Sequence, residues 1–221
     1  MNNYFGHSVF ISGNYAIIGA YGEASTGAAY IFERDSDGSW NQIDKIKASD
    51  PDPGDNFGNS VSISENYVIV GANGEDTGGS TAGAAYIFER NVDSSWNQVH
   101  KIKASDKGTD DQFGRSVFIR GNDAIVGSIL EDTNGNNNRG AAYIYERDSN
   151  GLWGQEVSGE TYRTETQKIQ PLDNNNSFFG VSVFISDNYY FVGASGANEK
   201  AAVYTFTRPL QQLALHPPAV V

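Results

Sequence analysis

The sequence has no cysteine among its 221 residues. That absence excludes disulfides, thiolate catalysis and Cys-ligated zinc, and it leaves the redox compartment open. Histidine is scarce as well, and the three present lie in unrelated contexts: His7, His100 and His216. The chain also lacks a Gly-x-Ser-x-Gly nucleophile elbow, a His-Glu-x-x-His zinc motif and a phosphate-binding loop. We therefore predict a protein that is not an enzyme.

Long apolar runs and positive charge are also lacking. No run approaches the roughly 18 to 20 apolar residues of a membrane span, and the stretch "MNNYFGHSVF" is not a signal peptide. If the protein is secreted, its signal segment lies outside this chain. The formal net charge of −12 disfavours nucleic acids and anionic membranes as partners. It is compatible with cations, basic proteins or neutral sugars, and equally with a surface that is merely soluble.

What the sequence does contain is one pattern written four times. The pair Phe-Gly begins each copy, and 13 residues separate its glycine from the glycine of the following Gly-Ala or Gly-Ser. A block "AAYIFER" follows, with a tryptophan ten residues after its tyrosine, and then a block such as "DKIKASD". The fourth copy lacks this last block. The Phe-Gly pairs begin at Phe5, Phe57, Phe113 and Phe179, and the tryptophans are Trp40, Trp96 and Trp153.

Each block predicts a strand, because it is short, rich in Val, Ile, Tyr and Phe, and bounded by turn residues. Gly13-Asn14 and Gly121-Asn122 suit two-residue hairpins. The twelve-residue stretch "GQEVSGETYRTE" after Trp153 is predicted to be a loop insertion without strands. The recurring glycines and tryptophans are interpreted as packing residues, although an exposed rim of tryptophans would indicate sugar binding.

Repeated four-stranded antiparallel units predict an all-β fold, a β-propeller of about four blades or a partial propeller. The repeats span residues 4–51, 56–106, 112–172 and 178–208, and residues 209–221 form a C-terminal tail. Three architectures are considered: a four-bladed ring, half of an assembly closed by another chain, and part of a longer propeller. The missing fourth strand of the last repeat and the off-pattern tail favour the third. Self-association or the remainder of a longer chain would complete the last two.

The order of Phe-Gly-x-Ser-Val, Val-Gly-Ala and a Gly-Ala-Ala-Tyr strand resembles the FG-GAP repeat of integrin α subunits and of bacterial secreted proteins. The resemblance covers residues 4 to about 208 and implies propeller blades and extracellular or cell-surface adhesion. Integrin-type blades often carry a calcium loop between their first two strands. Here that connection is as short as "SGNY", too short to supply the roughly six to eight oxygen ligands of calcium. We predict no cofactor, and calcium is not favoured.

Acidic loops are the candidate functional site. Strands that run up and down place the loops after the second and fourth strands on one rim, and these loops hold 13 of the 27 acids. The predicted ligand-binding residues are Glu23, Asp52, Asp55, Glu75, Asp76, Asp110, Asp111, Glu131 and Asp132. Asp50, Asp106, Asp173 and Glu199 complete the rim. Such a rim would attract a basic surface, whereas loop acids that only maintain solubility are the plain alternative.

Three function hypotheses follow from these observations. The first is a non-enzymatic extracellular module that binds a protein or glycan through the acidic rim. The second is a structural repeat scaffold within a larger secreted protein. The third is a hydrolase-type propeller that uses rim carboxylates, because paired carboxyl groups are the machinery of glycoside hydrolysis.

Overall fold

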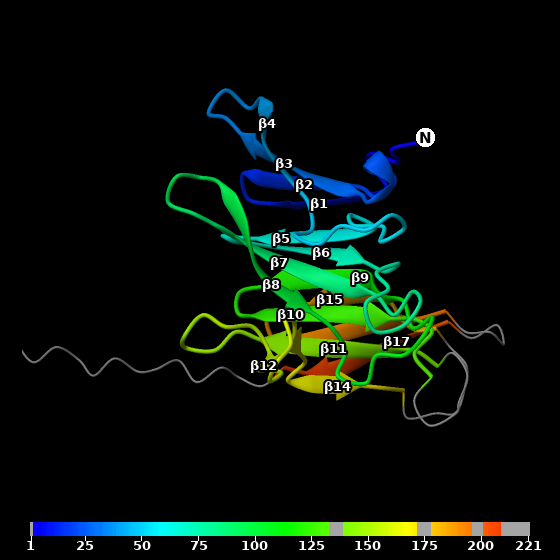
Figure 1. Cartoon of the computed structure of the whole chain (residues 1–221). Coiled ribbons are helices and arrows are strands. Elements are labelled where there is room, and N and C mark those ends of the chain that lie inside the picture. The colour runs from blue at the N-terminus through cyan, green and yellow to red at the C-terminus, as the bar shows by residue number, and fades with distance from the viewer. Residues whose placement is uncertain (1, 133–138, 172–177, 196–200, 209–221) are drawn as a thin grey trace, which may run out of the picture.

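The computed structural model describes residues 2–132, 139–171, 178–195 and 201–208 (Figure 1). Within these ranges the chain is all-β, with one short 3-10 turn, η1, at Glu23–Ser25 and no α-helix. No helix in the described ranges is long and apolar enough to cross a membrane. The predicted C-terminal tail, residues 209–221, lies outside the described residues.

Four sheets follow one another along the chain, and each begins with an antiparallel meander of three or four strands. Sheet 1 holds β1 (Ser8–Ser12), β2 (Tyr15–Ala20), β3 (Ala28–Arg34) and β4 (Trp40–Ile46). Sheet 2 holds β5 (Ser60–Ser64), β6 (Tyr67–Ala72), β7 (Ala84–Arg90) and β8 (Trp96–Ile102). Sheet 3 holds β9 (Phe113–Arg120), β10 (Asp123–Ser128), β11 (Ala141–Glu146) and β14 (Gln167–Ile169). Sheet 4 holds β15 (Phe179–Ile185), β16 (Tyr189–Ala194) and β17 (Ala202–Thr207).

The hairpins between the first two strands are as tight as predicted. Ser12 pairs with Tyr15, so Gly13 and Asn14 make up the whole β1–β2 turn. Gly13 has a φ of 58° and Gly121, in the β9–β10 turn, has a φ of 57°. A two-residue hairpin needs this left-handed backbone conformation, which glycine adopts without steric cost.

The insertion after Trp153 does not match the prediction of a loop without strands. It contains two short antiparallel strands, β12 (Gln155–Glu156) and β13 (Arg163–Thr164). Strand β13 pairs in parallel with β8, where Arg163 lies opposite Ile102, so the insertion of repeat 3 extends sheet 2 to six strands. Backbone groups at the outer edge of β8 thereby gain partners, because an unpaired edge N–H or C=O seeks a hydrogen bond. One such bond runs from Lys103 N to Arg163 O over 3.0 Å.

The sheets stack in chain order, from sheet 1 at the top of the view to sheets 3 and 4 at the bottom (Figure 1). Single parallel β-bridges link each sheet to the next, at Gly27↔Phe57, Gly83↔Phe113 and Gly140↔Phe179. No strand pairing or bridge among the described residues joins sheet 4 to sheet 1. The described sheets are therefore open at both ends and do not form the four-bladed ring that was one of the predicted architectures.

The hydrophobic core lies between the sheets rather than inside any one of them. Buried residues form three clusters, and each joins two successive sheets. The first cluster includes Ile17 of β2 and Val61 of β5, and the second includes Ile87 of β7 and Val126 of β10. Burial of such a side chain stabilises the fold by about 1.5–3 kcal/mol. Each sheet is thus stable through its neighbours, as in other repeat proteins.

The repeated tryptophans differ in their surroundings. Trp96 is 4% exposed and Trp153 fully buried, and each lies edge-on to a tyrosine of the preceding sheet. These two confirm the prediction that tryptophan packs between sheets. Trp40 occupies the same position in sheet 1, which has no preceding sheet among the described residues, and it is 39% exposed.

Candidate functional site

The loops that carry the predicted acids meet at one rim of the molecule. Backbone hydrogen bonds tie the loop after a fourth strand to loops after second strands on both sides. Gly54 N donates to Ser25 O over 2.9 Å, and Gly74 N donates to Asp55 O over 3.0 Å. The next loop repeats the pattern, with Asp110 N donating to Ser80 O over 2.8 Å. The shared rim expected from strand direction is therefore present.

The nine predicted binding residues fall into two groups on this rim. The buried or half-buried group is Glu23, Asp55, Glu75, Asp111 and Glu131. The exposed group is Asp52, Asp76, Asp110 and Asp132. Two further predicted rim acids, Asp173 and Glu199, lie outside the described residues. The sequence pattern thus placed these carboxylates on one rim, but it did not separate interior ones from exposed ones.

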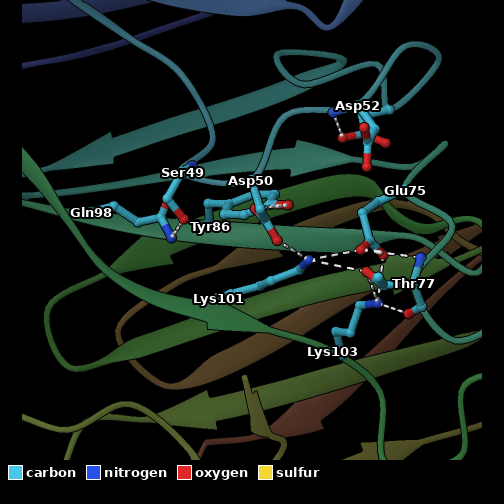
Figure 2. A network of polar contacts seen from close by, with 10 residues as sticks. Ser49, Asp50, Asp52, Glu75, Thr77, Tyr86, Gln98, Lys101 and Lys103 are labelled. Carbon is cyan, nitrogen blue, oxygen red and sulfur yellow. Dashed lines mark hydrogen bonds and ion pairs between the residues drawn. The ribbon is translucent and has the colours of Figure 1, made fainter. Parts of the chain in front are cut away.

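Glu75 is the centre of a buried ionic network (Figure 2). Lys101 Nζ lies 2.7 Å from Glu75 Oε1, and Lys103 Nζ lies 2.5 Å from Glu75 Oε2. Lys101 also contacts Asp50 Oδ2 at 2.6 Å, and Tyr86 donates to the other oxygen of Asp50 over 3.0 Å. Lys103 is 1% exposed, and this burial lowers its pKa despite the charge of Glu75. The carboxylate of Glu75 is therefore fully engaged inside the protein.

The same arrangement of Glu, Lys and Tyr recurs in sheets 1 and 3. Glu23 binds Lys45 and Tyr30 in sheet 1, where the lysine side chain is 35% exposed. In sheet 3, Lys168 Nζ lies 2.7 Å from Glu131, and that lysine also contacts Asp106. The register explains the recurrence, because the tyrosine of each third strand pairs directly with the lysine of the fourth strand.

These lysines are partners of the rim glutamates and were not among the predicted site residues. The signal that could have found them is the lysine before the isoleucine of the last block, which faces the tyrosine of "AAY" across the sheet in the first three repeats. Alternation along the two strands places both on one face, next to the glutamate four residues after the Gly-Ala glycine. The repeated glutamates therefore have a structural role at each sheet.

Asp55 and Asp111 close the loops in which they lie. Asp55 accepts from Asp52 N over 2.8 Å, and Asp111 accepts from Gly108 N over 2.6 Å. Burial raises the pKa of both carboxyl groups. For Asp111 the pKa rises to about 6, with burial as the main cause and the charges of Glu131 and Asp132 adding to it. The rim is thus a region of concentrated negative charge.

We expect Asp111 to make stability depend on pH. Its folded pKa of about 6 exceeds the unfolded value of about 3.9, so the folded state binds the proton more tightly. The resulting stabilisation is fully present below about pH 4 and disappears as pH rises through about 6. As the pH is raised from 4 to 7.5, the free energy of unfolding of Asp111→Asn should therefore rise by about 1–3 kcal/mol relative to that of the wild type. Urea unfolding of both proteins at the two pH values measures this, and parallel pH profiles would contradict it.

The exposed acids differ from the interior ones in their contacts. Among the described residues, no ion pair involves Asp52, Asp76, Asp110 or Asp132. Nor do the described ranges contain a group of three or more His, Asp or Glu side chains placed to hold a metal ion. The rim therefore presents carboxylates to solvent that can interact with a partner's positive charge.

A groove of about 520 Å³ lies among the hairpins of the opposite rim. Its walls come from the first strands of the sheets and include Phe10, Phe118 and Phe184. Phe10 lies edge-on to Phe118 with ring centroids 5.2 Å apart, and Phe118 lies 4.5 Å from Phe184. Ile63 and Ser64 of sheet 2 also line it, so the first strands of all four sheets converge here. The charged residues at this groove are Glu65, Arg120 and Arg208, so it does not share the one-sided charge of the acidic rim.

Together these features define a repeat protein in which each repeat forms an antiparallel sheet, and glycine and phenylalanine at constant spacing lie where the sheets stack. The chain belongs to the FG-GAP repeat family, whose model matches residues 1–32, 40–88 and 96–145. No curated protein matches the chain.

Two solved structures are similar in outline. The periplasmic gluconolactonase PpgL of Pseudomonas aeruginosa matches with 11% identity and a TM-score of 0.38, covering 92% of this chain and 72% of that one. The hemagglutinin-neuraminidase of parainfluenza virus 5 with the ligand DANA matches with 9% identity and a TM-score of 0.42. That match covers 93% of this chain and 61% of the viral protein.

Proposed function

We propose that the chain is an extracellular or cell-surface binding module whose four sheets are consecutive blades of a partial β-propeller. It binds a basic protein surface, or a glycan, through the exposed acids of one rim and without catalysis. The observation that carries this proposal is the division of the rim acids. Lysines engage the interior glutamates, whereas four aspartates remain exposed on loops that hydrogen bonds hold together.

The arrangement supports binding in two ways. The loops are preorganised, because Gly54, Gly74 and Asp110 donate backbone hydrogen bonds to neighbouring loops, and a rigid surface loses less entropy on association. The excess negative charge, −12 over the chain, increases the rate of encounter with a cationic partner and disfavours anionic ones. An exposed carboxylate also accepts hydrogen bonds from sugar hydroxyls or from lysine and arginine side chains.

The test compares two variants of equal net charge. The rim variant carries Asn at the four exposed positions, Asp52, Asp76, Asp110 and Asp132. The control carries the amide at four acids of the opposite rim: Asp37, Glu65, Asp93 and Asp187. Binding to an immobilised poly-L-lysine surface and to a glycan array is measured at two salt concentrations. We expect the rim variant to lose at least about tenfold in affinity and the control less than about twofold.

Equal losses of affinity in both variants would contradict a localised site and would show that binding depends on net charge alone. Binding by neither the variants nor the wild type would favour the second candidate, a scaffold for domains elsewhere in a larger protein. One observation supports that candidate: the ionic networks of Glu75 and Glu131 serve packing within the sheets. The third candidate, a hydrolase, would use the carboxyl groups of the rim. Scoring the same glycan array for cleaved products tests this candidate.

A further inference from the structure

The junctions between successive sheets repeat one set of side-chain contacts. At the first junction, Arg90 lies 4.8 Å above the ring of Tyr15, and the Trp96 ring lies 6.3 Å from it. At the second junction the contacts are the same at the next repeat, from Arg147 and Trp153 to Tyr67, at 4.7 and 5.5 Å. A sheet thus presents a tyrosine at the start of its second strand, and the following sheet covers it with an arginine and a tryptophan.

The third junction keeps the arginine with a different partner. Asp123 stands at the position of Tyr15 and Tyr67, and Arg208 of sheet 4 forms an ion pair with it. Tyr190 donates to the same carboxylate over 2.8 Å. At all three junctions, therefore, the arginine at the end of the third strand contacts the first residue of the second strand in the preceding sheet, even where that residue is not tyrosine.

Glycines set the distance at each junction. A Cβ added to Gly71 would lie 2.1 Å from Gly114 O of the next sheet, and one added to Gly127 would lie 2.0 Å from Gly180 O. Gly193 is the equivalent glycine of sheet 4, and among the described residues the three atoms nearest to an added Cβ all belong to Ser182 of its own sheet. The successive backbones can pack this closely only because no side chain intervenes.

The two outer faces of the stack each carry one half of this junction. On sheet 1, Phe5 is 55% exposed and Trp40 39% exposed, although the equivalent phenylalanines of the other sheets are buried. On sheet 4, Tyr189 stands at the tyrosine position and is 46% exposed. Val9 and Val203 extend the two apolar faces, at 64% and 70% exposed. Large apolar side chains exposed together on one face are typical of association sites.

We propose that a second copy of this chain docks head to tail, with sheet 4 of one copy packed against sheet 1 of the other. In this contact Tyr189 of one copy receives Arg34 and Trp40 of the other, in the order found at the first two junctions. Gly193 receives the backbone at Gly6, as Gly71 receives Gly114. We infer a second copy of this chain as the partner, because sheet 1 and sheet 4 complement each other in the way that the three internal junctions already show.

One position limits how closely the copies repeat the internal junctions. Ala201 stands where the other repeats have Gly27, Gly83 and Gly140, whose φ values are positive and at which an added Cβ would overlap the backbone of the next sheet. We therefore assign the contact between copies to the aromatic pair and to Gly193, without a β-bridge at Ala201. The contact is heterologous, so two copies either close into a ring or extend into a longer array. It is independent of the acidic rim.

Complementation between two single variants tests this arrangement. Analytical ultracentrifugation of the wild type should show a multiple of the monomer mass. Trp40→Ala alone and Tyr189→Ala alone should each weaken association by at least about 30-fold, because aromatic anchors dominate such contacts. Mixing the two variants should restore a dimer, since one junction of the mixed pair joins an intact Trp40 to an intact Tyr189. Val92→Ala, a fully exposed change in the β7–β8 turn, should leave the mass unchanged.

Three results would overturn the proposal. These are a monomeric wild type, an assembly that neither variant weakens, and a mixture of the two variants that stays monomeric. The last result would indicate a symmetric contact between like faces. Both substituted side chains are exposed, so far-UV circular dichroism should show folded variants. A loss of poly-L-lysine binding by the rim variant with unchanged mass would separate this proposal from the proposed function.

Discussion

Gly71→Ala is expected to lower the free energy of unfolding by more than about 4 kcal/mol, the range reserved for severe overpacking. The added Cβ would lie 2.1 Å from Gly114 O and 3.0 Å from its carbonyl carbon, both backbone atoms of sheet 3. A backbone carbonyl cannot rotate away as a side chain can. Sheets 2 and 3 would therefore have to separate, and the buried cluster between them would lose its packing.

Gly193→Ala is the matched control for this change. Both glycines have a serine hydroxyl of their own sheet 2.3 Å from the added Cβ, from Ser60 and Ser182, and a side chain can move. Only Gly71 also meets the backbone of a following sheet. We expect Gly193→Ala to cost less than about 1 kcal/mol in the folding of the single copy, while it dissociates the head-to-tail assembly.

Urea unfolding followed by tryptophan fluorescence measures both variants, at concentrations where the wild type is a single copy. Similar losses of stability for the two variants would show that the serine, and not the junction between sheets, makes the position intolerant. An unchanged Gly71→Ala protein would show that the sheets adjust to the extra methyl group, against the close approach described above.

Glu75→Gln is expected to lower the free energy of unfolding by about 3–5 kcal/mol, because it leaves two buried lysines without their common carboxylate. Lys101 and Lys103 are 7% and 1% exposed. Hydrogen bonds to Asp50 and Glu75 raise the pKa of Lys101 despite its burial, so this lysine stays charged in the folded protein. After the change Lys101 keeps its contact with Asp50, whereas Lys103 loses its carboxylate. An uncompensated buried charge is costly, although the intact wild-type pair contributes little net stability.

The repeat supplies the control for this change too. Glu23→Gln removes the equivalent carboxylate of sheet 1, where the Lys45 side chain is 35% exposed, and water can solvate the freed lysine. We expect this variant to lose less than about 1 kcal/mol. Replacing Glu75, Lys101 and Lys103 together by Leu, Met and Met should recover most of the loss, since no charge then stays buried. Equal losses in the free energy of unfolding for Glu75→Gln and Glu23→Gln would contradict the explanation that burial of the lysines makes the change costly.

Much of the fold could be predicted because turn residues and glycine spacing within each repeat specify its strands. The Gly13-Asn14 turn needs a positive φ, and the constant spacing of glycines fixes the lengths of the two strands that it joins. The position of β12 and β13 could not be predicted in this way. Their pairing depends on the free edge of β8, which lies more than 50 residues earlier in the sequence.

The candidate site was predictable only in part. Strand direction brings Asp52, Asp76 and Asp110 to one rim, and this follows from counting strands. The burial of Glu75 and Asp111 does not follow from it, because burial depends on which loop covers which. Cross-strand register could place a lysine beside the glutamate, since Tyr86 pairs with Lys101, but it does not show whether that lysine is buried.

The sequence by itself therefore determined the class of fold, the number of repeats and the rim on which the acids gather, since these arise from periodicity and turn geometry within about 50 residues. The tertiary structure alone decided which acids are neutralised and which remain exposed. It alone also showed that Trp40 and Tyr189 are exposed while their counterparts Trp96 and Tyr67 are buried. The physical reason is that burial and electrostatic environment are set by neighbouring sheets, and identical residues at the end of a stack have no neighbour on one side.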